Sequence, residues 1–519
     1  MRRAFVAISV AAAMSAPAVH AQLGSITFPT SGAAAAQPSF IRGVLLLHSF
    51  EYDDAAAAFR QAQSLDPRFA MAYWGEALTY THQVWNQQDA DRARAALHKL
   101  GATREARRAA APTARERGYL GAVEALYGEG SKPHRDTAYA DAMEQVMRDN
   151  PGDDEAAVFY ATALLGLSQG VRDVPTYMRA GAIAEGVFRR NPQHPGAAHM
   201  IIHAYDDPTH APLGLSAARA YSKIAPGAMH AQHMTTHIFL ALGLWRDVVA
   251  QNVIASGPDT AAWQPGHYTT WLHYAYLQEG KYAAARALLA SLAAHAAGRP
   301  RARGVIANLR ARQVLAMEAW DGPDARALDG DLAQAGEDGY EYATFAAGYA
   351  AAKRGDTARA SSLLSRLSTR NGATARTAVA GASASVVVPV ILELSLRAEL
   401  LSQAGRRDSA IGLLRRATAL EDGMPAEFGP PAVVAPSHEL LGALLLSANR
   451  ARDAADQYAR ALQLQPGRSA ALLGSARAES ASGRDARATR AYRQLADNWA
   501  AADSAVAGFA EVRGHVPKP

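Results

Sequence analysis

The sequence has 519 residues and no cysteine. That absence excludes disulfide bonds, thiolate metal ligands and cysteine nucleophiles together, and it is compatible with an oxidising compartment. Long hydrophobic runs are also missing, because no segment beyond the N-terminal region reaches the roughly 18 unbroken apolar residues of a membrane span. We therefore expect no membrane-spanning helix and no soft thiolate metal site.

Positive charge is spread along the chain rather than concentrated. The formal net charge of +5 and the isoelectric point near 9.3 come from scattered arginines, and there is no dense Lys/Arg run with interleaved aromatic residues. We expect no nucleic-acid partner. The sequence also lacks a nucleotide-binding glycine loop, a G-x-S-x-G elbow and an H-E-x-x-H motif, so it predicts no organic cofactor and none of the reactions that these motifs support.

The first 21 residues have the pattern of a secretory signal peptide. Two arginines follow Met1, an Ala/Val-rich apolar run covers residues 4–18, and small residues stand three and one positions before Gln22. We therefore exclude 1–21 from the fold and expect an exported protein, periplasmic or extracellular. Residues 22–39 are expected to form a flexible N-terminal segment.

The rest of the chain favours helix and repeats a spacing. Alanine, leucine and arginine are abundant, and only 7% of the residues are aromatic. Small residues allow two helices to pack closely, an aromatic residue fills the space between them, and proline ends the second helix. Pro192 and Pro226 stand 34 residues apart. The spacing recurs as Ala55, Phe59, Ala62 and Pro67, and again as Ala454, Tyr458, Ala461 and Pro466.

These motifs resemble those of the tetratricopeptide repeat (TPR) superfamily over most of residues 40–500. The segments AYWGEAL and HMTTHIFLALGLW also resemble an exported bacterial subfamily of TPR proteins. The resemblance implies an all-α solenoid of antiparallel helix pairs in a right-handed superhelix, with ligands bound in its concave groove. The expected parts are an N-terminal array with a His-rich groove (40–300), degenerate helical repeats (301–420), a Pro/Gly-rich loop (421–436), a C-terminal TPR pair (437–505) and a tail (506–519).

Two histidine pairs lie one repeat apart. Each pair is spaced by four residues, so its members share one helix face. The offsets are 233 − 199 = 34 and 237 − 203 = 34, and the TPR resemblance places both pairs in the groove. Neighbouring helices pack about 8–10 Å apart, which allows the pairs to converge on one ion. The hypothesis is one transition-metal ion held by His199, His203, His233 and His237, with His230 and Asp206 as further candidate ligands.

Imidazole ligands suit zinc, copper or iron. If only three side chains bind the ion, an open position allows hydrolytic or oxidative chemistry. The alternative is that these histidines hydrogen-bond to one another and to a bound peptide. Three functions therefore remain open: a groove that recognises a protein, peptide or small molecule and carries a metal; a metal-free interaction scaffold; and a metalloenzyme acting on a small substrate.

Other residues are candidates for the groove surface. The TPR resemblance gives Trp74 and Glu439 groove-facing positions, and it places His48 and His82 at the groove edge. His210 stands near a helix terminus, where it is an outer ligand or a turn residue. His273 takes a position of close helix packing, and we expect it to be buried and structural. The groove candidates are Trp74, His48, His82, His210 and Glu439.

Overall fold

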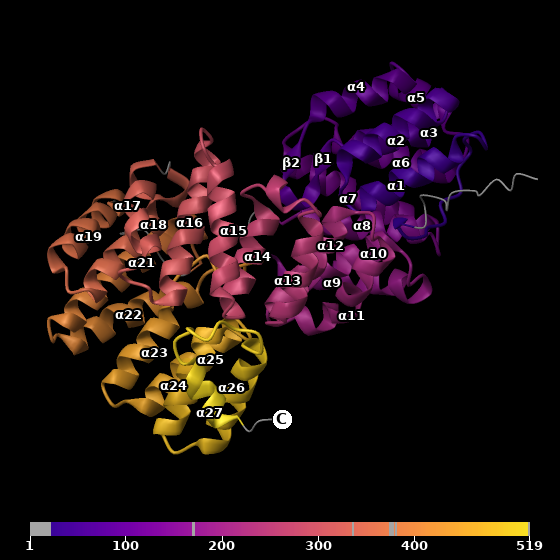
Figure 1. Cartoon of the computed structure of the whole chain (residues 1–519). Helices are drawn as coiled ribbons and strands as arrows, with labels where there is room; N and C mark the ends of the chain where they lie inside the picture. Colours follow the sequence, from indigo (N-terminus) through magenta and orange to yellow (C-terminus); the bar gives the residue numbers. More distant parts are fainter. Residues whose placement is uncertain (1–21, 169–171, 335–336, 373–377, 379–380, 517–519) are drawn as a thin grey trace, which may run out of the picture.

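The computed structural model describes residues 22–168, 172–334, 337–372, 378 and 381–516, and these are almost entirely helical. Consecutive helices pack against each other along the chain, which confirms the expected all-α, TPR-like solenoid (Figure 1). One small antiparallel ribbon joins β1 (Thr81–His82) to β2 (Gln87–Gln88). The predicted signal peptide lies outside the described residues. Within them, no helix has the length and apolar character needed to cross a membrane.

The first half of the chain carries most of the histidines. Its helices are α1 (Gln37–His48), α2 (Tyr52–Leu65), α3 (Ala70–Leu78), η2 (Gln83–Trp85), α4 (Ala90–Leu100), α5 (Arg104–Ala110), α6 (Ala114–Leu126), α7 (Lys132–Asp149), α8 (Asp154–Gly166), α9 (Val174–Arg190), α10 (Pro195–Ala204), α11 (Ala211–Ile224), α12 (Met229–Ala241), α13 (Trp245–Ala255), η3 (Thr260–Ala262) and α14 (His267–Gln278).

The second half continues the array, and a short helix lies within the tail expected at 506–519. Its helices are α15 (Tyr282–His295), α16 (Pro300–Met317), α17 (Pro323–Gln334), α18 (Glu337–Lys353), α19 (Thr357–Asn371), α21 (Ala384–Gln403), α22 (Arg407–Asp422), α23 (Ser437–Ser447), α24 (Ala451–Leu464), α25 (Ser469–Ala481), α26 (Asp485–Asn498) and α27 (Phe509–His515).

The repeat spacing has the packing role expected of it. The Phe59 ring fills the space between α1 and α3, where Gly43 and Gly75 leave room. A Cβ atom added at Gly75 would lie 2.3 Å from that ring, and one at Gly43 would lie 2.7 Å from it. Tyr458 plays the same part near the C-terminus, where a Cβ atom at Gly474 would lie 2.1 Å from its ring. Small residues therefore set how closely neighbouring helices approach.

Residues 22–36 pack against the array, which corrects the expectation of a flexible segment. The Phe28 side chain is only 2% exposed, and its ring contacts Phe40, Trp74 and Tyr119. The backbone N–H of Ser25 donates to a carbonyl 168 positions away, that of Gln193, at 2.9 Å. The segment therefore covers the N-terminal core and ties it to the turn before α10.

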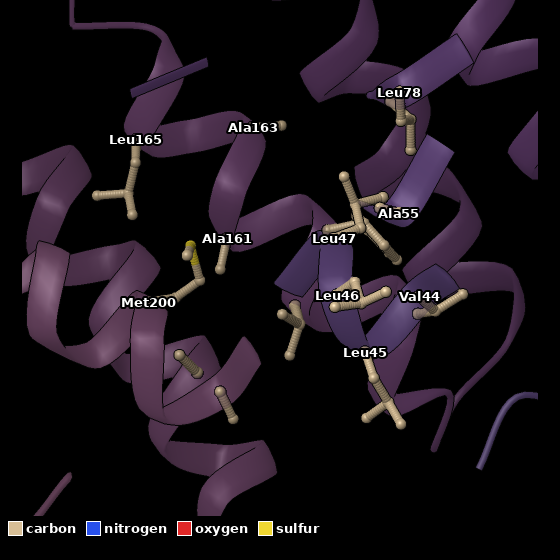
Figure 2. Close-up of a cluster of buried hydrophobic side chains, with 14 of the residues drawn as sticks. Val44, Leu45, Leu46, Leu47, Ala55, Leu78, Ala161, Ala163, Leu165 and Met200 are labelled. Atoms are coloured by element: carbon tan, nitrogen blue, oxygen red, sulfur yellow. The ribbon is translucent and has the colours of Figure 1, made fainter. Parts of the chain in front are cut away.

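A buried apolar cluster holds α1, α8 and α10 together. Figure 2 shows side chains of α1 from Val44 to Leu47 near Ala161 of α8 and Met200 of α10. All of these side chains are buried. Because α1 ends at His48 and α10 carries His199, the cluster fixes how the end of one helix meets the face of the other.

The solenoid closes on itself. The indole N–H of Trp245, at the start of α13, donates to the carbonyl of Gly467 before α25 at 2.8 Å, and Arg468 donates to the Tyr274 hydroxyl at 2.9 Å. A Cβ atom at Gly243 would lie 2.5 Å from the backbone oxygen of Pro466, in the turn before α25. Gly243 and Gly467 both have positive φ angles. The C-terminal repeats therefore dock against α13 and α14 (Figure 1).

Candidate metal centre

Three consecutive repeats bring histidines to one place. His199 on α10, His233 on α12 and His267 at the start of α14 are each 34 residues apart, because 233 − 199 = 34 and 267 − 233 = 34. Pro195 stands at the first position of α10, where its fixed φ angle favours helix initiation. The equivalent helices of neighbouring repeats therefore present equivalent positions to a shared space.

The first triad is His199, His203 and His230. One nitrogen from each lies within 4.8 Å of the others. Nδ1 of His199 donates to the carbonyl oxygen of His48 at 2.7 Å. That carbonyl is at the C-terminus of α1, where helix carbonyls have no partner within the helix. Since Nδ1 of His199 carries the proton, its Nε2 has a free lone pair.

One nitrogen of each ring in the first triad has no hydrogen-bond partner in the part of the chain that the structure describes. Among the described residues, Nε2 of His199, His203 and His230 is in each case buried and without a hydrogen bond. Buried polar atoms in folded proteins are nearly always paired, so three orphans in one place call for a ligand.

Phe50 covers the first triad at a conformational cost. Its φ angle of 55° lies in the left-handed region, where a bulky residue is unusual. Its ring centroid lies 4.3 Å from that of His199, 5.7 Å from that of His203 and 5.5 Å from that of His230. Strained residues of this kind cluster at functional sites.

The second triad is His233, His237 and His267, again with one nitrogen each within 4.8 Å. Nδ1 of His233 donates to Oδ1 of Asn252 at 2.7 Å, and the Asn252 amide nitrogen in turn donates to a backbone carbonyl. Nδ1 of His237 donates to the Asp206 carboxylate at 2.5 Å. Carboxylate and amide partners of this kind orient metal-binding imidazoles.

These partners leave two lone pairs facing each other. Nε2 of His233 and Nε2 of His237 are 3.2 Å apart, and in the neutral rings neither carries a proton. Two nitrogens bound to a common tetrahedral ion at about 2.0–2.1 Å would be about 3.3 Å apart. The observed separation therefore matches a pair of ligands to one cation.

Burial keeps most of these rings neutral. It lowers the pKa of His199 to about 3 and that of His267 to about 4. Burial, together with charge repulsion from neighbouring histidines, also holds the pKa values of His203, His230 and His233 well below 6.5. The neutral form is the one that binds metal ions.

A cavity of about 660 Å³ lies beside residues that contact the second triad. The Pro/Gly-rich connection between α22 and α23 lines it, together with Asp206, Trp245 and Tyr274. The Phe428 ring from this connection lies 5.4 Å from the His237 ring. At Gly429, a Cβ atom would lie 2.7 Å from the Trp271 side chain, so the loop approaches closely.

No family model matches the chain, and no curated protein matches it. Solved structures with a similar fold include the human IFIT1 dimer with m7Gppp-AAAA, at 13% identity over 92% of each chain with a TM-score of 0.35. Yeast Tom70 matches at 11% identity over 93% of this chain and 95% of its own, with a TM-score of 0.28. The APC/C hetero-tetramer Cut9–Hcn1 matches at 10% identity over 93% and 90%, with a TM-score of 0.31. At these scores the likeness carries no functional argument.

The arrangement corrects the predicted ligand set. The sequence predicted His199, His203, His233 and His237 around one ion, but the structure divides them between two triads that His230 and His267 complete. His267 was not among the predicted ligands, although extending the 34-residue offset by one repeat identifies its position. Asp206 bonds to the far nitrogen of His237, so it orients a candidate ligand and belongs to neither triad.

Two of the predicted groove residues are buried in the core. Trp74 is fully buried among Phe28, Tyr119 and Phe159, which contradicts its groove-facing assignment. Trp74 faces the N-terminal segment, which was expected to be flexible. His48 is 4% exposed and donates to Glu155 at 2.7 Å.

The other candidates have protein partners. His82 stacks on Tyr52 with ring centroids 3.9 Å apart, beside a surface cavity. His210 pairs with Asp207 at 2.7 Å, and Glu439 pairs with Arg468 inside the closed solenoid. None of these three belongs to a metal-compatible group among the described residues. His273 is fully buried and hydrogen-bonds to Gln313 at 3.0 Å.

A third buried group, His48, Glu155 and His194, has a different character. Nδ1 of His194 accepts the N–H of Ala197 at the start of α10, so its Nε2 carries the proton and lies 3.2 Å from Glu155. Burial by itself raises the Glu155 pKa, but attraction from both histidines outweighs it and lowers the pKa to about 2. His48 hydrogen-bonds to the Glu155 carboxylate, whereas Nε2 of His194 has no hydrogen-bond partner among the described residues, and one atom from each of the three residues lies within 4.8 Å of the others.

Proposed function

We propose that this protein binds transition-metal ions, with the closed TPR-like solenoid holding two of them, one at each histidine triad. The observation that carries the proposal is the 3.2 Å approach of Nε2 of His233 to Nε2 of His237. Asp206 and Asn252 hold the protons of these rings on the opposite nitrogens. Two facing lone pairs repel each other unless a cation lies between them.

The ligand chemistry favours zinc, copper or iron. Each triad offers only imidazoles, and the chain has no cysteine to provide a thiolate. Three protein ligands leave at least one coordination position open, as at catalytic rather than structural zinc sites. The bound ions would therefore be available to a further ligand.

We also propose that the protein is exported. The N-terminal pattern of a basic pair, an apolar run and small residues before Gln22 supports this. Intact-mass measurement of the protein secreted by an expressing bacterium should give a chain that begins at Gln22. A cytoplasmic chain that keeps residues 1–21 would contradict it.

Elemental analysis of the purified mature protein tests the metal proposal. We expect about two transition-metal ions per chain, and loss of most of both in the His199→Ala/His233→Ala double variant, which removes one ligand from each triad. The matched control is His98→Ala/His134→Ala, since both of these histidines are exposed and outside the triads. Its metal content should equal that of the unmodified protein.

A metal-free protein would refute the proposal if added zinc or copper, or a chelator, left its thermal unfolding unchanged. Ligands that bind only the folded state raise its stability by mass action, so metal binding at a true site must raise the temperature of thermal unfolding. In that case the short contact between the two imidazoles would hold a shared proton.

A metalloenzyme acting on a small molecule is the second candidate function. A cavity of about 660 Å³ lined by Asp206 and Phe428, both in contact with His237, supports it, because small-molecule sites have about 300–1,000 Å³ of volume. Turnover of small esters and phenols by the metal-loaded protein tests this. Activity that disappears in His267→Ala and persists in His98→Ala/His134→Ala would support it.

A further inference from the structure

The two triads lie side by side on the same helices. His199 and His203 of α10 are followed in space by His237 and His233 of α12 and then by His267 of α14. Successive ring centroids along this row are 4.7, 6.2, 5.0 and 4.5 Å apart. The row of imidazoles is therefore continuous from one triad to the other.

Helix α12, which carries three of the six triad histidines, also joins the triads. His230 of the first triad and His233 of the second are three residues apart on α12, a spacing that makes two side chains neighbours on the helix surface. Across the helices, His203 of the first triad faces His237 of the second. Both ions would therefore occupy one space between α10 and α12.

Charge balance in that space is incomplete. The six imidazoles are neutral ligands, so two divalent ions would bring four positive charges. Among the described residues, two carboxylates hydrogen-bond to members of the triads: Asp206, bonded to His237, and Glu51, which accepts the backbone N–H of His230 at 3.1 Å. Buried charge without compensation is costly, so further negative charge is needed.

We infer that the two triads form one paired-ion centre that takes a small anion between its ions. The inference rests on the proposed metal binding. Each triad leaves a coordination position open, and Asp206 and Phe428, which both contact His237, line a neighbouring cavity. The anion belongs to the class of hydroxide, azide or a small carboxylate, which combine a single negative charge with the size for a shared site.

Electron paramagnetic resonance of the copper(II)-loaded mature protein tests the pairing. With two copper ions per chain, we expect less than half of the copper to appear as an isolated-ion signal, because neighbouring spins couple. Azide should then produce a new charge-transfer absorption at one azide per two copper ions. The control variant His98→Ala/His134→Ala should behave in the same way.

Disruption of one triad should restore the isolated-ion copper signal of the other triad. His237→Ala/His267→Ala leaves the first triad intact, so we expect one copper ion per chain with a full isolated-ion signal. If that variant does not fold, the unmodified protein loaded with one part copper to nine parts zinc gives the same test. Most copper ions then have a diamagnetic zinc neighbour, and the full signal should return.

The outcomes separate this inference from the proposed function. Two copper ions per chain with a full, uncoupled signal would overturn the pairing and leave metal binding intact. Azide binding at one per copper would overturn the shared anion site. A protein that takes up no copper or zinc would refute the proposed function itself.

Discussion

Replacing Asp206 with asparagine should weaken one of the two metal sites selectively. The Asp206 carboxylate accepts the Nδ1 proton of His237 at 2.5 Å, and both side chains are buried. It therefore keeps the His237 lone pair on Nε2, directed at the second triad. Loss of such an outer partner typically costs 10–100-fold in metal affinity, or about 1.4–2.7 kcal/mol.

Calorimetric titration of the metal-free protein with zinc, in the presence of a competing chelator, measures this effect. We expect the unmodified protein and Asp206→Asn to bind the first-triad ion equally, with the second event about 10–100-fold weaker in the variant. Asp207→Asn is the matched control, because its carboxylate pairs with Arg172 and His210 rather than with a triad.

Two results would refute this reasoning. If Asp206→Asn bound both ions with unchanged affinity, the carboxylate would not be orienting His237. If Asp206→Asn and Asp207→Asn weakened binding to the same extent, the effect would be that of net charge near the sites and not of the hydrogen bond.

Three further predictions concern the frame around the metal centre. Glu155→Gln should lower the free energy of unfolding near pH 7 by about 3 kcal/mol, because it leaves buried histidines without their anion. Since the Glu155 pKa is lowered from 4.5 to about 2 in the folded state, this stabilisation is complete above pH 4.5 and the gap should close as pH falls towards 2, as measured by urea denaturation across pH. Arg468→Met should raise the rate of proteolysis in the 423–436 loop, because Glu439 and Tyr274 lose the arginine that both of them contact. Metal content should stay constant. Unchanged proteolysis would show that this contact does not hold the C-terminal repeats against α14. Gly474→Ala should destabilise the protein by about 1–3 kcal/mol in thermal unfolding, because the new methyl group meets the Tyr458 ring, and an unchanged midpoint would contradict the packing argument.

The sequence predicted the helical solenoid well because repeat proteins are stabilised by contacts between neighbours in the chain. The pattern that ends at Pro67 and recurs up to Pro466 encodes the close packing of helix pairs, and the glycines around Phe59 and Tyr458 bear this out. Residues 22–36 were misjudged because they have no helical period. Their role depends on Phe28 reaching rings from three different elements.

The candidate site was predicted in part. The 34-residue offset identified four of the six triad histidines, because equivalent positions of successive repeats face the same side. It did not show how the nitrogens divide into two groups. That division depends on which ring nitrogen already has a partner, and those partners are a helix end at His48, the Asn252 amide and the Asp206 carboxylate.

The helices and the faces on which the histidines stand follow from the sequence, since helix geometry and repeat period are local properties of the chain. Which nitrogens carry lone pairs, and what surrounds them, depends on contacts between distant parts of the chain. The His199 proton is held by a carbonyl 151 positions away, and Trp245 closes the solenoid through a bond that spans 222 positions. Contacts between residues so far apart produce no repeating pattern in the sequence, because each contact occurs once and its two residues do not occupy equivalent repeat positions.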